Sequence, residues 1–211
     1  MNEVNEALRF QMNLPDNALL CDSIHYVNGE VLFRFNPELI SEHPLGWISF
    51  DETGEIAEIN DDLQSYWGSV LLTNKEGTST LLYYGNNEEN CLFYAYSDGK
   101  LKKLMDTTSS FDFGLYERKG ETYLVVYTDQ TVYRINASGV NIDTIENAFS
   151  AIEMPDYVLE AVPYSNDDIL CILSGGTLLH WNGKKSDVLC DDVRFVWSDC
   201  RRVVQNNLRI Y

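Results

Sequence analysis

The chain has 211 residues, of which 45% are hydrophobic, 23% charged and 12% aromatic. This is the composition of a folded globular protein and argues against a disordered chain, and no run reaches the ~18 apolar residues of a membrane helix. Thirty-three acidic against 15 basic residues give a net charge of −18, which repels nucleic acid and anionic membranes and favours a basic partner.

The N-terminal stretch, MNEVNEALRFQMNLP, is acidic and polar and lacks the apolar segment of a secretory signal, which predicts a cytoplasmic protein. The cysteines agree with a reducing compartment, because they are odd in number and scattered. We expect them to be reduced and mostly buried. They are Cys21, Cys91, Cys171, Cys190 and Cys200. Neither they nor the three histidines have the spacing of a zinc site, so no metal or other cofactor is expected.

In chain order, one arrangement of strands occurs four times. Each occurrence is an alternating strand, a turn with glycine and a second alternating strand: WISFDETGEIAEI (47–59), CLFYAYSDGKLKKL (91–104), TVYRINASGVNIDTI (131–145) and TLLHWNGKKSDVL (177–189). The turns need a residue at positive φ, which glycine adopts without steric cost. The turn glycines, at intervals of 40 to 45 residues, are Gly54, Gly99, Gly139 and Gly183.

Two further strands precede each hairpin, so the repeating unit is four short antiparallel strands in ~40–45 residues. The units cover approximately 16–59, 64–104, 112–145 and 157–189. The C-terminal part, 193–211, has three more strands, and the N-terminal piece ALRFQM (7–12) is one alternating strand that could supply the fourth. Ring closure of this kind removes exposed sheet edges.

This period resembles the β-propeller superfold, in the broad sense of WD-repeat and kelch-like chains, over essentially the whole sequence. No WD dipeptide, kelch double glycine or aspartate box recurs, so no named family within the fold is indicated. The resemblance implies an all-β, single-domain protein over 1–211, a small five-bladed propeller whose N-terminal strand closes the last blade. The alternative is an open or two-sheet antiparallel β-meander.

In a propeller, the loops between blades and the loops between second and third strands share one face. Acidic residues concentrate in these loops, whereas Lys75, Lys100, Lys184 and Lys185 fall at turns of the opposite face. We expect Trp67 and Phe113 to be buried, each in the strand that follows its loop. We expect Phe149 and Met154 to lie at the surface. The predicted partner-binding residues are Asp61, Asp62, Glu88, Glu89, Asp106, Asp112, Phe149, Glu153, Met154, Asp156, Asp191 and Asp192.

Motifs of catalysis are missing from the sequence. It has no GxSxG nucleophile elbow, no phosphate loop and no EF-hand spacing, which predicts a protein that is not an enzyme. Glycoside hydrolysis is the least unlikely activity, because it needs two carboxylates at the axis. Acids on candidate inner strands are Asp22, Glu160, Asp112 and Glu117.

The charge therefore favours a module that binds or inhibits a basic protein, of the kind found in immunity proteins that neutralise a cognate toxin. An assembly subunit would use the same physics. A carbohydrate-binding or glycoside-hydrolysing propeller is the alternative, since the chain has 13 Tyr and four Trp. The simplest interpretation of the charge is that it keeps the protein in solution.

Overall fold

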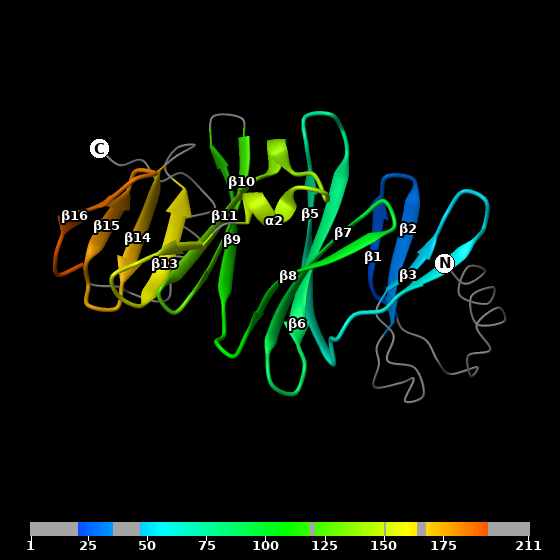
Figure 1. The fold of residues 1–211 in the computed structure, drawn as a ribbon, viewed down its shortest axis with the longest axis horizontal. Helices are drawn as coiled ribbons and strands as arrows, with labels where there is room; N and C mark the ends of the chain where they lie inside the picture. The colour runs from blue at the N-terminus through cyan, green and yellow to red at the C-terminus, as the bar shows by residue number, and fades with distance from the viewer. Residues whose placement is uncertain (1–20, 36–46, 119–120, 150, 164–167, 194–211) are drawn as a thin grey trace. The chain divides into compact units, whose positions relative to one another are not determined.

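A computed structural model describes residues 21–35, 47–118, 121–149, 151–163 and 168–193. These residues form four four-stranded antiparallel sheets, in each of which neighbouring strands follow one another along the chain (Figure 1). The first sheet contains β1 (Cys21–Val27), β2 (Glu30–Phe35), β3 (Trp47–Phe50) and β4 (Ile56–Ile59). The second contains β5 (Ser65–Thr73), β6 (Ser79–Asn86), β7 (Cys91–Ser97) and β8 (Lys100–Thr107).

The third and fourth sheets repeat the arrangement. The third contains β9 (Asp112–Arg118), β10 (Glu121–Thr128), β11 (Thr131–Asn136) and β12 (Ala151–Glu153). The fourth contains β13 (Val158–Pro163), β14 (Ile169–Leu173), β15 (Leu178–Trp181) and β16 (Ser186–Cys190). The all-β class and the four-stranded unit are thus confirmed. The expected fifth sheet, from 193–211 and 7–12, lies outside the described residues apart from Val193, so the closure of a five-bladed ring stays a prediction.

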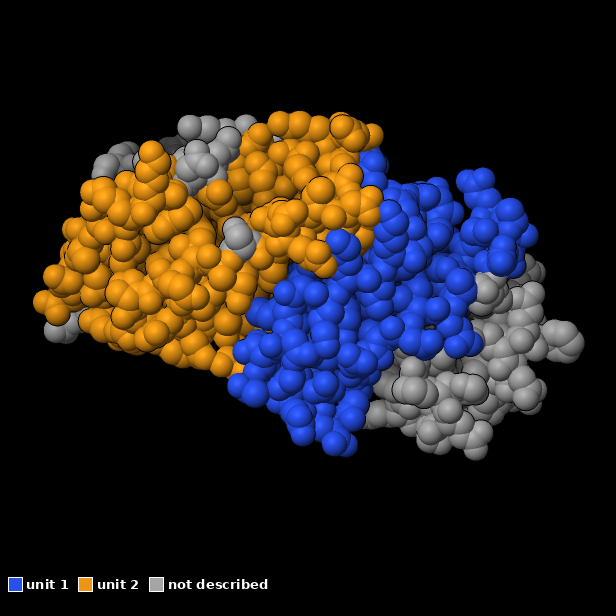
Figure 2. Space-filling view, in the orientation of Figure 1, with its two compact units in different colours: residues 1–72, 77–108 blue, residues 73–76, 109–211 orange. Residues whose placement is uncertain are grey.

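The chain divides into two compact units (Figure 2). Unit 1 comprises residues 1–72 and 77–108 and holds the first two sheets, and unit 2 comprises 73–76 and 109–211 and holds the other two. Each unit has its own core of inward-facing alternate residues. In unit 1 the core includes Leu32, Trp47, Leu81, Tyr83 and Tyr94. In unit 2 it includes Val125, Val132, Ile169, Cys171 and Leu179.

Positive-φ turn residues connect most hairpins as expected. Gly54, Gly99 and Gly183 have φ of 82°, 71° and 85°. Gly139 does not have positive φ, so the prediction of a glycine hairpin at 131–145 is wrong.

The third sheet differs because local hydrogen bonding ends β11 early. The Asn136 side chain accepts a hydrogen bond from the Ser138 N–H and caps a short 3-10 helix, η2 (Ala137–Gly139). A helical turn, α2 (Ile145–Ala148), follows, and its Ile145 is buried. The fourth strand is therefore β12, which pairs with β11 through Thr131 and Glu153 at one end.

The cysteines follow the expectation in part. Cys91, Cys171 and Cys190 are free thiols, as expected. Of the three, Cys171 is buried, Cys91 is half-buried and Cys190 is exposed. Desolvation raises the pKa of Cys171 to about 12, so this thiol is inert. In the part of the chain that the structure describes, no helix has the length and apolarity to cross a membrane.

Candidate functional site

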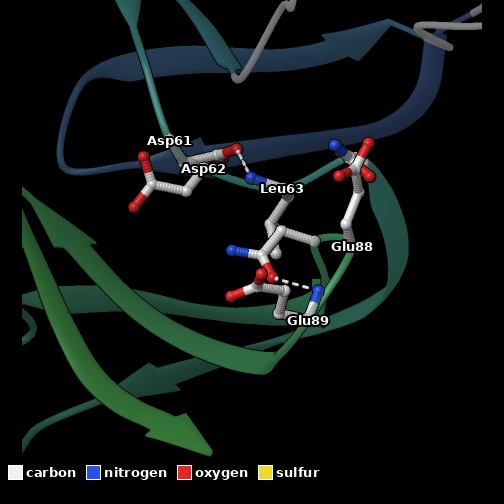
Figure 3. A pocket seen from close by; sticks show the side chains of 7 residues that line it. Asp61, Asp62, Leu63, Glu88 and Glu89 are labelled. Carbon is white, nitrogen blue, oxygen red and sulfur yellow. Dashed lines mark hydrogen bonds between the residues drawn. The ribbon is translucent and has the colours of Figure 1, made fainter. Parts of the chain in front are cut away.

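A shallow depression in unit 1 is lined by two acidic loops (Figure 3). Residues 61–64, between β4 and β5, form one side, and residues 87–89, between β6 and β7, form the other. Its volume is about 460 Å³. We call it the acidic depression. It brings together the predicted residues Asp61, Asp62, Glu88 and Glu89.

Hydrogen bonds within and between the two loops fix the shape of the depression. The Gln64 N–H donates to the Asn86 carbonyl at 2.9 Å and joins the loops. Asn87 Oδ1 accepts from the N–H groups of Glu89 and Asn90, at 3.1 and 2.7 Å. Asx turns of this kind are a reason for Asn to occupy such loops. The acidic side chains therefore stand on a backbone that is already ordered.

Three of the four acids at the depression are exposed: Asp62, Glu88 and Glu89. The Tyr94 hydroxyl donates to Asp62 Oδ2 at 3.2 Å, and Lys103 Nζ lies 3.5 Å from the same oxygen. Burial of the Tyr94 ring raises the pKa of its hydroxyl to about 12, so the phenol stays protonated at neutral pH.

The side chain of Asp61, the fourth acid, is buried although the residue lines the depression, so the expectation that its carboxylate belongs to an exposed acidic surface is wrong. Its carboxylate is 1% exposed and lies 2.9 Å from Nη1 of Arg34, whose side chain is 0% exposed. Its other oxygen accepts from the Leu63 N–H at 3.0 Å. The guanidinium carbon is 5.1 Å from the Tyr66 ring centroid and 5.8 Å from that of Trp47. Asp61 thus neutralises a cation in the core and shapes the loop.

Asp106, on β8, lies in a small polar cluster beside Asp62. Lys103 Nζ is 2.7 Å from Asp106 Oδ2, and Asn90 Nδ2 donates to Asp106 Oδ1 at 2.6 Å. The hydrogen bond from Lys103 lowers the pKa of Asp106 and raises that of Lys103. The sequence analysis missed Lys103, a base placed among the predicted acids. On a regular strand, residues three apart lie on opposite faces, and the bulge at Leu104, where Phe93 and Tyr94 pair with Met105 and Lys103, brings Lys103 and Asp106 together. The sequence carries no signal for this bulge.

The separation of charge expected for the two ends of the sheets is wrong for unit 1. Lys100 does lie at the end opposite the depression, in the β7–β8 hairpin. However, the β3–β4 turn at that end carries Asp51, Glu52 and Glu55, and Asp98 lies in the same hairpin turn as Lys100. Acidic residues therefore occur at both ends of these sheets, and the depression is distinguished by its shape.

The remaining predicted acids belong to unit 2 and do not line the depression. Asp112 and Glu153 are exposed, on β9 and β12. Asp156 is half-buried and accepts from the Tyr157 N–H at 2.8 Å. Asp191 and Asp192 are exposed beyond β16. Their role in partner binding stays a prediction.

The expected surface positions of the large side chains are wrong. Phe149 is 7% exposed because its ring stacks on Tyr133, with centroids 4.7 Å apart, and Met154 is 5% exposed within the core of unit 2. Trp67, expected to be buried, is 46% exposed, and Phe113 is half-buried. Trp67 lies on β5, the first strand of its sheet, and its ring centroid is 6.2 Å from that of Tyr84.

The candidate axial carboxylates do not form a described pair. Glu160, on β13, is half-buried and accepts a hydrogen bond from the Tyr116 hydroxyl at 3.2 Å. Glu117 is exposed, and the side chain of Asp22 lies outside the described part of the structure. Within the described ranges, no group of three or more His, Cys, Asp and Glu side chains could hold a metal ion.

Comparison with known proteins shows no match to a family model and none to a curated protein. Among solved structures, the chain is similar to AztD from Citrobacter koseri, with 16% identity and a TM-score of 0.39 over 80% of this chain and 46% of that one. The apo form of AztD has 16% identity to this chain and a TM-score of 0.41, over 81% of this chain and 48% of that one. YCF48 bound to D1 peptide has 12% identity to this chain and a TM-score of 0.33, over 82% of this chain and 55% of that one. The chain spans about half the length of these structures.

Proposed function

We propose that this chain is a binding module without catalytic activity, which docks a basic protein through the acidic depression. The observation that carries the proposal is the exposure of Asp62, Glu88 and Glu89 around one depression whose loops are hydrogen-bonded to each other. Ordered loops lose little conformational entropy on binding, so the electrostatic attraction is retained in the complex.

The depression suits a lysine or arginine side chain of the partner. A cation placed there would meet the carboxylates of Glu88 and Glu89, while Lys103 is already paired with Asp106 and Asp62. The net charge of −18 accelerates encounter with a basic surface, and the contribution falls as salt rises. We therefore expect a partner that binds at low salt and is released at high salt.

Within this class of partner, the proposal favours a toxin, and this protein would then be its immunity protein. A nuclease toxin has a cationic groove for substrate phosphates, and an acidic surface can occupy that groove in their place. This protein would then act in the cytoplasm together with its toxin, and it would have no nucleic-acid or membrane partner of its own.

Two triple variants test the proposal. Asp62→Lys/Glu88→Lys/Glu89→Lys reverses the exposed charges of the depression and leaves the buried Asp61 in place. Glu52→Lys/Glu55→Lys/Glu58→Lys makes the same change in net charge at exposed positions of the β3–β4 hairpin in the same unit. Both, with the wild type, are used as bait in extracts of the native organism at low and at high salt.

The expected result is one basic protein, captured by the wild type and by the β3–β4 variant, lost with the depression variant and released by salt. The purified partner is then assayed for toxin activity with and without each variant. Equal capture by both triple variants would show that binding depends on net charge alone, and the depression would be abandoned as the docking site.

Carbohydrate binding is the second candidate, favoured by two exposed aromatic rings in unit 1. Tyr26 is 64% exposed and Trp67 46% exposed, and such rings can stack on sugar faces. A glycan array tests binding, with Trp67→Ala as the variant expected to lose it. For hydrolysis, Glu160 is the described candidate acid, and chromogenic glycosides with Glu160→Gln provide the assay. If no glycan on the array binds and no chromogenic glycoside is hydrolysed, carbohydrate binding and hydrolysis are both excluded as the function.

A further inference from the structure

Lys103 stands beside the acidic depression because β8 contains a bulge. With Leu104 as the extra residue, Lys103 and Asp106 lie on one face of the sheet, whereas Lys102 alternates to the other face. The ammonium of Lys103 lies 2.7 Å from Asp106 Oδ2 and 3.5 Å from Asp62 Oδ2. A bulge re-aims the side chains that flank it. Here it brings a base to an acid of the depression.

The two loops that Figure 3 shows on either side of the depression differ in charge as a result. On one side, Lys103 lies close to Asp62, and the Tyr94 hydroxyl donates to the same carboxylate at 3.2 Å. On the other side, Glu88 and Glu89 are exposed, and within the described ranges neither belongs to an ion pair. We call these the compensated side and the open side.

Lys103 remains at the compensated side when a ligand approaches. Its shorter contact is with Asp106, which also accepts a hydrogen bond from Asn90 Nδ2 at 2.6 Å. The hydrogen bond to Asp106 raises the pKa of Lys103, so the amine is charged at neutral pH. A ligand cation that approaches Asp62 therefore meets a fixed like charge, and the repulsion offsets part of the attraction by the carboxylate. A cation at the open side is not opposed in this way.

Repulsion within a binding site is a means of specificity, because it penalises unwanted ligands. The net charge of −18 attracts every cation in solution, including polyamines and basic peptides, without discriminating among them. A fixed base at one side of the depression supplies discrimination. It lowers the gain of a ligand that is basic throughout and leaves the gain of a ligand that places its cations at the open side.

We propose that Lys103 is a specificity-determining residue of the acidic depression. It directs the depression to a partner surface that is basic where it faces Glu88 and Glu89 and uncharged where it faces Asp62. It weakens the binding of ligands that are basic throughout. This role rests on the proposed function, because it concerns the same depression and its basic partner, and it adds where on the partner the charge lies.

Binding of fluorescein-labelled hexalysine, measured by fluorescence anisotropy at low salt, tests this role. Lys103→Met removes the fixed base and is expected to bind hexalysine about threefold more tightly than the wild type, the size of an exposed charge interaction. Lys102→Met makes the same change in net charge on the opposite face of β8, so it is the matched control and is expected to change the affinity little. Equal gains in the two variants would overturn the role, because net charge would then explain both.

A second probe tests the specificity itself. The peptide KKSSSS, with the same label, has cations for one side of the depression alone. Its affinity is expected to change little in Lys103→Met, so the preference for hexalysine over this peptide should rise about threefold. In an Asp62→Asn background the gain should disappear, since no carboxylate then draws a cation to the compensated side. An unchanged preference, or the same gain without the Asp62 carboxylate, would contradict the role of Lys103.

The depression variant, Asp62→Lys/Glu88→Lys/Glu89→Lys, separates failure of this role from failure of the proposed function. If it binds hexalysine as tightly as the wild type does, cations bind elsewhere, and the proposed function fails together with the role. If it loses binding while Lys103→Met and Lys102→Met bind alike, the depression stands as the docking site, and Lys103 has no part in its specificity.

The ion pair between Lys103 and Asp62 can be measured without a ligand. NMR titration of the Lys103 ammonium gives its pKa, which Asp62→Asn is expected to lower because a neighbouring negative charge is removed. Glu88→Gln removes a charge from the open side and is expected to leave this pKa unchanged. The Lys103 side chain is 40% exposed, so Lys103→Met should unfold at nearly the wild-type temperature. A pKa that Asp62→Asn leaves unchanged would overturn the role.

Discussion

The two units are built from the same kind of four-stranded sheet but differ in the side chains that fill their cores. In unit 1, the rings of Trp47, Tyr66 and Tyr83 pack around the buried ion pair of Arg34 and Asp61. In unit 2, the described core is built from apolar and tyrosine side chains such as Val125, Ile169 and Leu179. Among the described residues, the fully buried ion pair of unit 1 has no counterpart in unit 2. A charge pair makes a core specific and vulnerable, because each partner is costly without the other.

The largest expected effect comes from breaking this ion pair. Asp61→Ala leaves the Arg34 charge buried, and we expect the free energy of unfolding to fall by ~3–5 kcal/mol. The loss is large because, in the described structure, Nε and Nη2 of Arg34 already have no hydrogen-bond partner. Urea denaturation measures it.

Two further variants separate charge from packing at this site. Asp62→Ala, one residue along and exposed, is expected to cost less than ~1 kcal/mol. Arg34→Met/Asp61→Leu removes both charges and is expected to be more stable than Asp61→Ala. If the double variant is the less stable of the two, the buried charge of Arg34 is not the cause.

In unit 2, the corresponding experiment removes apolar volume. Leu179 is 2% exposed in the core, so Leu179→Ala is expected to cost ~2–5 kcal/mol through lost burial and the cavity that remains. Leu179→Met, which conserves volume, should cost less than ~1.5 kcal/mol. Leu115, 45% exposed, provides the control, since Leu115→Ala should change little in the same denaturation experiment. A similar loss at Leu115 would contradict the assignment of the core.

A smaller effect is expected at a turn that joins the two sheets of unit 1. Asn28 Nδ2 donates to Ser97 Oγ and Asp98 Oδ1, both at 2.9 Å, and Asn28 Oδ1 accepts from the Ser79 N–H at 2.7 Å. Asn28→Ala loses these bonds and is expected to cost ~1–3 kcal/mol in thermal unfolding. Asn28 has a φ of 49°, which glycine adopts without strain. Asn28→Gly therefore removes the side-chain hydrogen bonds without adding the backbone strain that alanine would add. Wild-type stability in Asn28→Gly would show that the side chain contributes nothing.

The smallest expected effect is a pH dependence that unit 1 owes to His25. Its Nε2 lies 2.7 Å from Ser69 Oγ, and partial burial lowers its pKa below the usual 6.5. The unfolded chain therefore binds the proton more tightly, so stability is full above the unfolded pKa and falls as the pH drops from about 7 through 6.5. In His25→Gln this slope should flatten between about pH 7 and 5, as measured by thermal unfolding. If the pH dependence of stability in His25→Gln is the same as in the wild type, groups other than His25 cause it.

Much of the fold follows from alternation and turn glycines in the sequence. Three hairpins were predicted because Gly54, Gly99 and Gly183 stand where the chain needs positive φ. The third was mispredicted because Asn136 uses its side chain to cap η2, a local competition that alternation does not reveal. Strand periodicity therefore locates the sheets, and it fails for a last strand only in the third sheet, where a side-chain cap ends the preceding strand.

The site was less predictable than the fold. The sequence predicts acidic loops at 60–68 and 86–90, and the structure brings residues 61–64 and 87–89 of these loops together. The fate of Asp61 depends on Arg34, 27 residues earlier, and on no local pattern. Trp67 and Phe149 were misplaced for the same reason, since exposure beside a loop is decided by what packs against it.

The hydrogen bonds of Asn28 also bear on the chemical lifetime of the protein. In an Asn–Gly sequence the glycine nitrogen readily attacks the side-chain amide carbon and ammonia leaves, which closes a succinimide ring. Water then opens the ring to give aspartate or isoaspartate. In the folded chain the amide of Asn28 is held away from this reaction by Ser79, Ser97 and Asp98. Unfolding releases it, so protein stored in denaturant should gain one mass unit at this peptide faster than folded protein. Refolded molecules with aspartate at 28 would face Asp98 with a second carboxylate, so each period of unfolding would leave a weaker turn behind.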